Sequence, residues 1–236
     1  MGLLDRGTSL YRHPRPHAVL WRRYRHYTAQ REFIGSVALS IVAFLGSVIA
    51  SFFAIRYATE RASNSVTDIV LSNVPALDVG GIFVVSTLLL IAFIALLIFA
   101  HPKRIPFAMY SMTLFFLIRS TFISLTHIGP FPTQTESAYD WGVIISKFLF
   151  SSDLFFSAHT GIPFLFALIF WREETLRYIF IGWSIFMAAI VLLGHLHYTI
   201  DVVSAFFITY GIFHIAEWLF PKARALFLAD EAAEAR

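Results

Sequence analysis

The sequence predicts an all-α, polytopic membrane protein with six transmembrane helices and both termini in the cytoplasm. Its 236 residues are 58% hydrophobic and 14% charged, and their mean hydropathy is +0.70. A soluble domain carries roughly a quarter charged residues. The charged residues here are confined to short stretches between long apolar ones, which is the pattern of a chain embedded in a bilayer.

Six apolar segments are each close to the roughly 20 residues that a helix needs to cross a hydrocarbon core. Backbone groups inside lipid must be hydrogen-bonded internally, so apolar runs of this length are expected to be helices. The segments run over residues 33–57, 79–100, 105–125, 154–171, 178–194 and 199–220, and the fourth and fifth are the shortest.

Lysine and arginine set the orientation, because cytoplasmic loops carry an excess of them. With a cytoplasmic N-terminus, fourteen of the eighteen lie on the cytoplasmic side, and the exceptions are Arg56, Arg61, Arg119 and Lys147. The excess of arginine over lysine and the short loops favour a bacterial inner membrane. The expected organisation is a basic cytoplasmic segment over 1–32, a six-helix membrane catalytic domain over 33–221 and a cytoplasmic tail over 222–236.

Two interpretations of the basic segment stay open. Aromatic and basic residues alternate between Trp21 and Tyr27, which suits a helix lying on an anionic membrane surface. A basic tail that only sets the topology explains the same residues equally well. The net charge of +3 follows from this topology and does not indicate a nucleic-acid partner. The absence of cysteine excludes disulfides, thiolate nucleophiles and Cys-ligated metals.

Polar residues at the ends of the predicted helices point to chemistry, because a charged group at the centre of a membrane helix costs at least ~2.5–3.5 kcal/mol. In the predicted topology five of them lie on the external side, each at or near a helix end. One shared site at that face is the simplest explanation. The five are Asp78, Arg119, His159, His197 and Asp201.

The residue types in this group describe phosphoryl transfer. His197 and Asp201 are four residues apart and share one face of a helix. A carboxylate that binds one ring nitrogen fixes the tautomer and leaves the other nitrogen nucleophilic. His159 would then act as acid and base, and Arg119 would bind phosphate through its planar guanidinium. Together these roles predict a reaction through a phosphohistidine.

Two stretches of sequence also carry a resemblance to a known family. Residues 151–160 read SSDLFFSAHT, and residues 197–202 read HYTIDV. They resemble the catalytic motifs Cys-Gly-Asp-x-x-Phe-Ser-Gly-His-Thr and His-Tyr-Thr-x-Asp-Val of the sphingomyelin synthase family, a branch of the type-2 phosphatidic acid phosphatase superfamily. Pro75–Asp78 is similar to the family's Pro-Leu-Pro-Asp element, and Arg119 with Thr126 is similar to its Arg/Thr motif. The resemblance covers roughly residues 70 to 210.

The resemblance implies a role for each matching residue. His197 would attack phosphorus, Asp201 would orient it, and His159 would protonate the departing diacylglycerol and later deprotonate the acceptor. The family moves a phosphocholine or phosphoethanolamine headgroup from phosphatidylcholine or phosphatidylethanolamine to ceramide, without a metal or another cofactor. The lipid bilayer is the expected environment, another lipid alcohol or water is a possible acceptor, and a homo-oligomer stays open. The implied substrate-binding and phosphate-binding residues are Arg119, Ser157, Thr160, Tyr198, Asp153 and Asp78.

The sequence departs from the family pattern where Ser151 and Ser152 replace Cys-Gly and where Ala158 replaces the glycine before the histidine. The main alternative is a lipid phosphate phosphatase of the same superfamily, acting on monoesters. Its Lys-x6-Arg-Pro motif does not occur, and residues 190 and 191 are apolar where it would have Ser-Arg. A monoester carries nearly two negative charges and needs several basic ligands, so a single candidate arginine fits a diester better.

Several polar residues also have a structural interpretation. Asp153 and Asp78 each precede an apolar run and suit a helix cap as well as a site. His127, His195 and His214 are expected to hydrogen-bond between helices.

Three other classes of site fit less well. His195 and His197 are two residues apart and would not face one metal ion on a helix. Ser157 lacks the Gly-x-Ser-x-Gly elbow of a serine hydrolase. A membrane transporter would carry titratable residues through the full bilayer depth, whereas here only Glu217 lies near the cytoplasmic end of a span.

Overall fold

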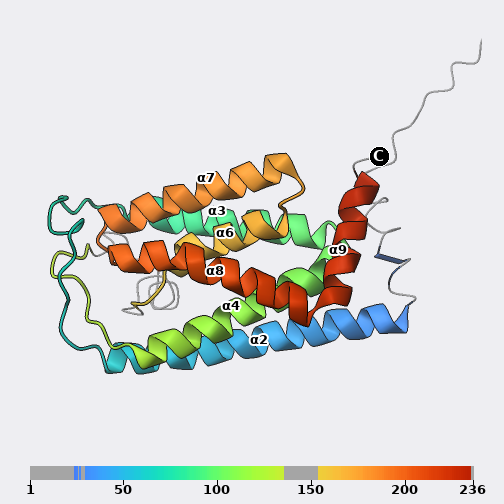
Figure 1. Cartoon of the computed structure of the whole chain (residues 1–236), viewed down its shortest axis with the longest axis horizontal. Coiled ribbons are helices and arrows are strands. Elements are labelled where there is room, and N and C mark those ends of the chain that lie inside the picture. Colours follow the sequence, from blue (N-terminus) through green and yellow to red (C-terminus); the bar gives the residue numbers. More distant parts are fainter. Residues whose placement is uncertain (1–23, 26, 28–29, 136–153, 235–236) are drawn as a thin grey trace, which may run out of the picture.

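The computed structural model describes residues 24, 25, 27, 30–135 and 154–234, and within them every regular element is a helix (Figure 1). The expected basic segment over 1–32 lies largely outside these residues, as do Asp153 and residues 151–152 of the first motif. The elements are α2 (Arg31–Glu60), α3 (Gly80–Phe99), the 3₁₀ helix η1 (Pro102–Arg104), α4 (Ile105–Leu125), α6 (Ala158–Ile169), α7 (Glu174–Leu193), α8 (Thr199–Leu219) and α9 (Pro221–Glu234).

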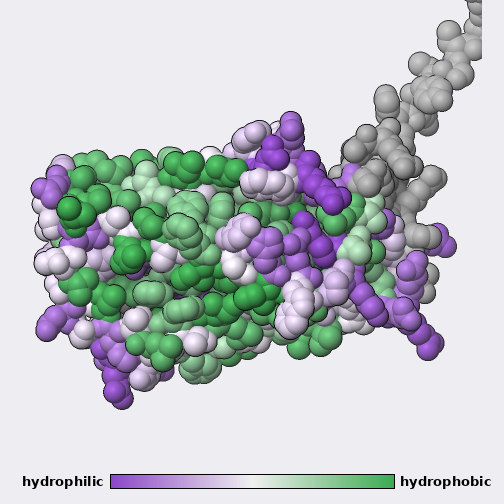
Figure 2. All heavy atoms as spheres, in the orientation of Figure 1, coloured by the Kyte–Doolittle hydropathy of each residue, from purple (hydrophilic) through white to green (hydrophobic). Residues whose placement is uncertain are grey.

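Five helical segments among the described residues are long and apolar enough to cross a membrane, which confirms the predicted all-α, polytopic class but not the predicted count of six spans. They are α2, α3, η1 with α4, α7 and α8. Apolar side chains form a broad belt around the middle of the molecule, and polar side chains gather towards its two ends (Figure 2). The chain is therefore an integral membrane protein with several spans.

The fourth predicted segment, 154–171, contains a shorter helix than its apolar run suggested. Helix α6 has 12 residues, which corresponds to about 18 Å. It begins only at Ala158, because Ser157 has an extended conformation and caps the helix, and Phe156 has a positive φ of 29°. Helix α6 packs against α7 and α8, and its residues 165–169 are buried. It is a central helix of the bundle.

Helix α2 runs alongside α4 at one side of the bundle (Figure 1). Its buried residues are small: Ser40, Ser47, Ser51 and Ala58. The hydroxyls of Ser40 and Ser47 donate to carbonyls in the preceding turn of α2. Small residues let two membrane helices approach closely, so this face explains how α2 packs on α4.

The core between α4, α6, α7 and α9 is aromatic. Rings of Phe166, Phe170 and Phe180 lie 5.7–6.4 Å from one another, within the range of favourable aromatic pairs. Gly161 of α6 lies at the closest approach of this helix to its neighbours. A Cβ at Gly161 would lie 2.8 Å from the Phe115 ring of α4, so only glycine permits this packing.

The two ends of the bundle differ in what they contain. We call the end with the connecting loops 61–79 and 126–135 the loop end, and the opposite end the α9 end (Figure 1). Helices α6 and α8 both begin at the loop end. Helix α9, which occupies residues expected to form a tail, packs across the other end and buries Phe227.

Candidate active site

The loop end contains a histidine–aspartate pair at the start of α8: His197 lies two residues before the helix, and Asp201 is in its first turn. The Nδ1 atom of His197 lies 3.2 Å from Oδ2 of Asp201, and both side chains are buried. The sequence predicted that both would share one face of a helix, and this is wrong in detail: Tyr198 is extended, so His197 precedes α8 and its ring reaches Asp201 across the helix start. Because a carboxylate can only accept, Nδ1 carries the proton and the Nε2 atom keeps its lone pair. The pair thus presents a nucleophilic nitrogen.

Asp201 has a second task in the same turn. Its Oδ2 atom also accepts a hydrogen bond from the backbone N–H of Tyr198 at 3.0 Å, which caps the start of α8. Its Oδ1 atom is buried and has no hydrogen-bond partner among the described residues. The helix cap therefore holds the carboxylate against His197, while one oxygen retains its capacity to accept.

His159 lies in the first turn of α6, next to this pair. The imidazoles of His159 and His197 have centroids 6.3 Å apart and are tilted by 52°. On its other side His159 packs against Phe83 of α3, with centroids 4.5 Å apart. The two imidazoles are therefore neighbours at the loop end.

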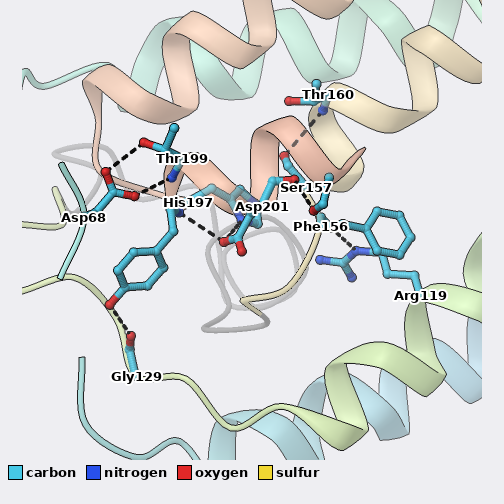
Figure 3. Close-up of polar contacts among 11 residues, drawn as sticks. Asp68, Arg119, Gly129, Phe156, Ser157, Thr160, His197, Thr199 and Asp201 are labelled. Carbon is cyan, nitrogen blue, oxygen red and sulfur yellow. Dashed lines mark hydrogen bonds and ion pairs between the residues drawn. The ribbon is translucent and has the colours of Figure 1, made fainter. Parts of the chain in front are cut away.

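A main-chain hydrogen bond holds the two histidine-bearing helices in register. The backbone N–H of Ser157, the residue before α6, donates to the carbonyl of Asp201 at 3.0 Å (Figure 3). The Ser157 hydroxyl oxygen then caps α6 by accepting from the N–H of Thr160 at 3.4 Å. The start of α6 is thereby fixed beside the first turn of α8. The positive end of the α6 dipole lies at the same place and favours an anion.

Arg119 reaches this region from α4. Its side chain is buried, and its Nε donates to the carbonyl of Phe156 at 3.2 Å (Figure 3). Phe156 has the positive φ noted above, a conformation that costs energy in a non-glycine residue. Its ring packs on Phe115 and Phe122. The guanidinium is thus fastened to the segment that leads directly into Ser157 and His159.

The loops at this end are tied to the turn between α7 and α8. His195 has a positive φ of 52°, and its ring nitrogens contact Thr133 Oγ1 at 2.6 Å and the carbonyl of Val74 at 3.2 Å. The hydroxyl of Tyr198 donates to the carbonyl of Gly129 at 2.9 Å and accepts from the N–H of Val66. Both side chains therefore hold loops, and His195 connects loops and not helices.

The remaining residues predicted for the site lie in different places. Asp78 is exposed and accepts from the N–H of Gly80, so it caps α3. Thr160 is buried, and its hydroxyl oxygen has no hydrogen-bond partner among the described residues. The Tyr198 hydroxyl donates its only proton to a loop carbonyl. Asp153 lies outside the described residues.

Two residues that the sequence did not single out also contribute. Phe83 supports the His159 imidazole from α3, and Asp68 binds Thr199 at the start of α8. Burial opposes ionisation of Asp68, but hydrogen bonds from Thr199, Leu71 and Val70 outweigh it and lower its pKa. No sequence signal separated Asp68 from the other polar residues of its loop.

Within the described part of the chain, no group of three or more His, Asp or Glu side chains is arranged to hold a metal ion. The catalytic roles of the two histidines, Asp201 and Arg119 stay predictions. The structure adds that these residues lie at the same end of the bundle. A phosphate-sized anion would meet two imidazoles and a helix N-terminus there, with a guanidinium fastened to the adjoining segment.

Comparison with known proteins gives one result for this region. Residues 151–218 match the family model described as PAP2 superfamily C-terminal. No curated protein and no solved structure matches the chain. The matched segment contains His159, His197 and Asp201. Over this segment the chain is similar to the type-2 phosphatidic acid phosphatase superfamily.

Proposed function

We propose that this protein is a membrane phosphotransferase of the sphingomyelin synthase type. It moves the headgroup of a glycerophospholipid, phosphocholine or phosphoethanolamine, to ceramide, to another lipid alcohol or to water. The observation that carries the proposal is the pair of imidazoles 6.3 Å apart, one of them bound to a buried carboxylate. Two such bases on either side of a phosphate suit a double displacement through a covalent intermediate.

In the first half of the reaction, the Nε2 lone pair of His197 attacks phosphorus of the donor. The bond between phosphorus and the glycerol oxygen breaks, and protonated His159 gives its proton to that oxygen, so diacylglycerol leaves. Asp201 stabilises the positive charge that develops on the His197 ring. The headgroup phosphate is then bound to Nε2 as a phosphohistidine.

In the second half, neutral His159 removes the proton from the acceptor hydroxyl. The acceptor oxygen attacks phosphorus, the P–N bond breaks, and its electron pair returns to His197. Arg119 and the first-turn N–H groups of α6 stabilise the negative charge of the phosphate oxygens in both steps. Every proton is accounted for by His159, so the cycle needs no other co-reactant.

The choice of a diester over a monoester rests on charge. A headgroup diester carries one negative charge and a phosphate monoester nearly two, so a monoesterase needs more basic ligands. In the described part of the chain, Arg119 is the one arginine or lysine with a hydrogen bond to the segment before His159. A lipid phosphate phosphatase is the second candidate, favoured by the superfamily match itself.

The topology of the proposal places the loop end at the exoplasmic or periplasmic face. The charge distribution of the sequence supports this orientation, since the loop end carries few of the arginines. The donor would then be drawn from the leaflet beside α6 and α8, where its phosphate lies at the depth of the histidines.

The direct test supplies purified protein in detergent with phosphatidylcholine or phosphatidylethanolamine, ceramide and a chelator. Products are separated by thin-layer chromatography. We expect release of diacylglycerol, headgroup transfer to ceramide when it is the acceptor, and loss of both in His197→Ala. The matched control is His214→Ala, because His214 is exposed near the α9 end and pairs there with Glu217.

Phosphatidic acid is assayed in parallel for release of inorganic phosphate. Faster turnover of phosphatidic acid than of either diester, lost in His197→Ala, would replace the transferase by the lipid phosphate phosphatase. Full diester turnover by His197→Ala would remove the phosphohistidine from the mechanism.

A further inference from the structure

Asp68 is a buried carboxylate at the loop end that the proposed chemistry does not use. It lies in the loop 61–79, and only 8% of it is exposed. Its Oδ1 atom accepts from the N–H groups of Val70 and Leu71, at 2.9 and 3.1 Å, within its own loop. A buried carboxylate without such partners would be strongly unfavourable.

The same carboxylate also reaches α8, far away in the sequence. Its Oδ2 atom accepts from the backbone N–H of Thr199 at 2.6 Å, and its Oδ1 atom accepts from the Thr199 hydroxyl at 2.8 Å (Figure 3). The first N–H groups of a helix have no partner inside the helix. Asp68 therefore caps α8 from another segment, and its negative charge lies at the positive end of the helix dipole.

The position of Thr199 gives this contact its significance. Thr199 lies two residues after His197 and two before Asp201, in the turn that carries the imidazole–carboxylate pair. Within that turn, the N–H of Tyr198 donates to Oδ2 of Asp201 and caps the helix. The same Oδ2 atom binds His197. Movement of the turn would change the cap and the imidazole contact together, so anchors from outside it matter: Ser157 holds the Asp201 carbonyl, and Asp68 holds Thr199.

We infer that Asp68 and Thr199 are positioning residues for the proposed phosphoryl transfer, holding the first turn of α8 so that His197 keeps its bond to Asp201. The inference rests on the proposed function for its kinetic consequence. Neither residue touches the reacting atoms in this assignment. The other loop contact in this turn, through the Tyr198 hydroxyl, holds a side chain, whereas Asp68 holds the helix backbone itself.

The first variant is Asp68→Asn, which keeps the shape and removes the charge. An amide has one oxygen, so its NH₂ group must face either the Thr199 N–H or the three donors around Oδ1. The second variant, Thr199→Val, removes the hydroxyl and keeps the shape. Its counterpart, Thr199→Ser, keeps the hydroxyl. Asn73→Ala is the control, because Asn73 is in the same loop and exposed, and its side-chain amide donates to the Ile69 carbonyl of that loop.

Diacylglycerol release by purified protein is measured for each variant. For Asp68→Asn we expect kcat to fall by about tenfold to a hundredfold, the loss expected when reacting groups are displaced by about an ångström. KM should stay within about twofold, because the substrate contacts are intact. The kcat of Thr199→Val should fall by a smaller factor, and that of Thr199→Ser should stay close to the parent value. The kcat of Asn73→Ala should equal that of the parent protein. A kcat within about twofold of the parent for both Asp68→Asn and Thr199→Val would overturn the inference.

A second measurement does not depend on activity. Nitrogen NMR of protein labelled in its histidine rings, with His197 assigned from His197→Ala, reports which ring nitrogen carries the proton. The parent should show His197 protonated at Nδ1, and Asp68→Asn should show a mixture of tautomers or exchange broadening. An unchanged His197 signal in Asp68→Asn and Thr199→Val would overturn the inference even if the enzyme assay finds no turnover. Should Asp68→Asn fail to fold, Thr199→Val and its serine counterpart decide the question alone.

Discussion

The two ends of the bundle both bury charged side chains, but they use them differently. At the α9 end, Arg104 is 2% exposed and donates to Glu173 at 2.9 Å and to Asp230 at 3.2 Å. His101 adds a second contact to Asp230, at 2.9 Å. The Arg104 guanidinium also lies over the ring of Phe170. Opposite charges from three segments thus pair with each other and join α9 to the bundle.

The loop end contains a different combination. Two imidazoles have centroids 6.3 Å apart, a single carboxylate binds one of them, and the Oδ1 atom of that carboxylate has no hydrogen-bond partner among the described residues. Pairing of this kind leaves groups able to accept or donate protons. Glu231 at the α9 end also has buried oxygens without a partner among the described residues, so unused hydrogen-bonding capacity alone does not separate the two ends. The comparison teaches that the loop end differs by its combination of two neighbouring imidazoles with a carboxylate, whereas the ion pairs of the α9 end join helices.

The largest effect, on kcat, is expected when one histidine at each end is replaced by glutamine. His159→Gln should lower kcat by about a hundredfold to ten-thousandfold, because it removes the proposed acid and base, and should leave the unfolding temperature in detergent unchanged. His101→Gln should lower the free energy of unfolding by about 1 kcal/mol, which is seen as a lower unfolding temperature. It should leave kcat unchanged. Equal kinetic effects of the two substitutions would erase the distinction between the ends.

An intermediate effect is expected from Arg104→Met, which removes the shared charge of the α9 end. Breaking a buried ion pair by removing one partner costs several kcal/mol, and because Asp230 and Glu173 are partly exposed we expect about 2–3 kcal/mol. Thermal unfolding in detergent measures this loss. The kcat of the surviving folded protein should equal that of the parent. A selective loss of kcat would show that the α9 end communicates with the histidines.

The smallest effect is a pH dependence at the α9 end. Burial and the nearby charge of Glu173 raise the pKa of Glu231 to about 7, from an ordinary value of 4.5. The native state therefore holds a proton that the unfolded chain has lost, and stability falls as pH rises from about 4.5 to 7. Glu231→Gln removes this penalty, so it should stabilise the protein at pH 8, by about 1 kcal/mol once solvent screening is allowed for. At pH 5 it should have little effect.

Thermal unfolding of Glu231→Gln at both pH values checks the sign. Asp230 is the matched control, because its pKa is lowered: burial opposes its ionisation, but the hydrogen bond from His101 and the charges of His101, Arg104 and Lys103 outweigh burial. Asp230→Asn should destabilise the protein at pH 8, the opposite of Glu231→Gln. Destabilisation by Glu231→Gln at pH 8 would mean that its charged form is favoured.

Hydropathy was sufficient to predict most of the helices, because the length of an apolar run decides whether it can cross a bilayer. It failed for residues 154–157, which are apolar enough to extend a helix. Their conformation depends on the Ser157 cap and on the contact of Phe156 with Arg119, which are local and tertiary features. It also missed α9, although Pro221 at its first position is a favourable start for a helix.

The site was partly predictable for a related reason. The sequence brought His197 and Asp201 together by their spacing, and both histidines lie near the beginning of a helix, but His197 precedes α8 and its contact with Asp201 depends on the extended Tyr198. The roles of loop residues could not be predicted in this way. Asp68 and Asp78 look alike in sequence, but only the folded loop brings Asp68 to Thr199. Likewise, Tyr198 fits a phosphate ligand by motif, although its hydroxyl donates to Gly129.

The hydrogen bond between the Ser157 N–H and the Asp201 carbonyl determines which residues can replace Ser157. Because both atoms belong to the main chain, the distance between the imidazoles does not depend on which side chain occupies position 157. Ser157 is completely buried, so the smaller glycine can replace it while the helix starts stay aligned. Proline alone among the twenty lacks the required hydrogen, so Ser157→Pro separates the two histidines without altering either of them.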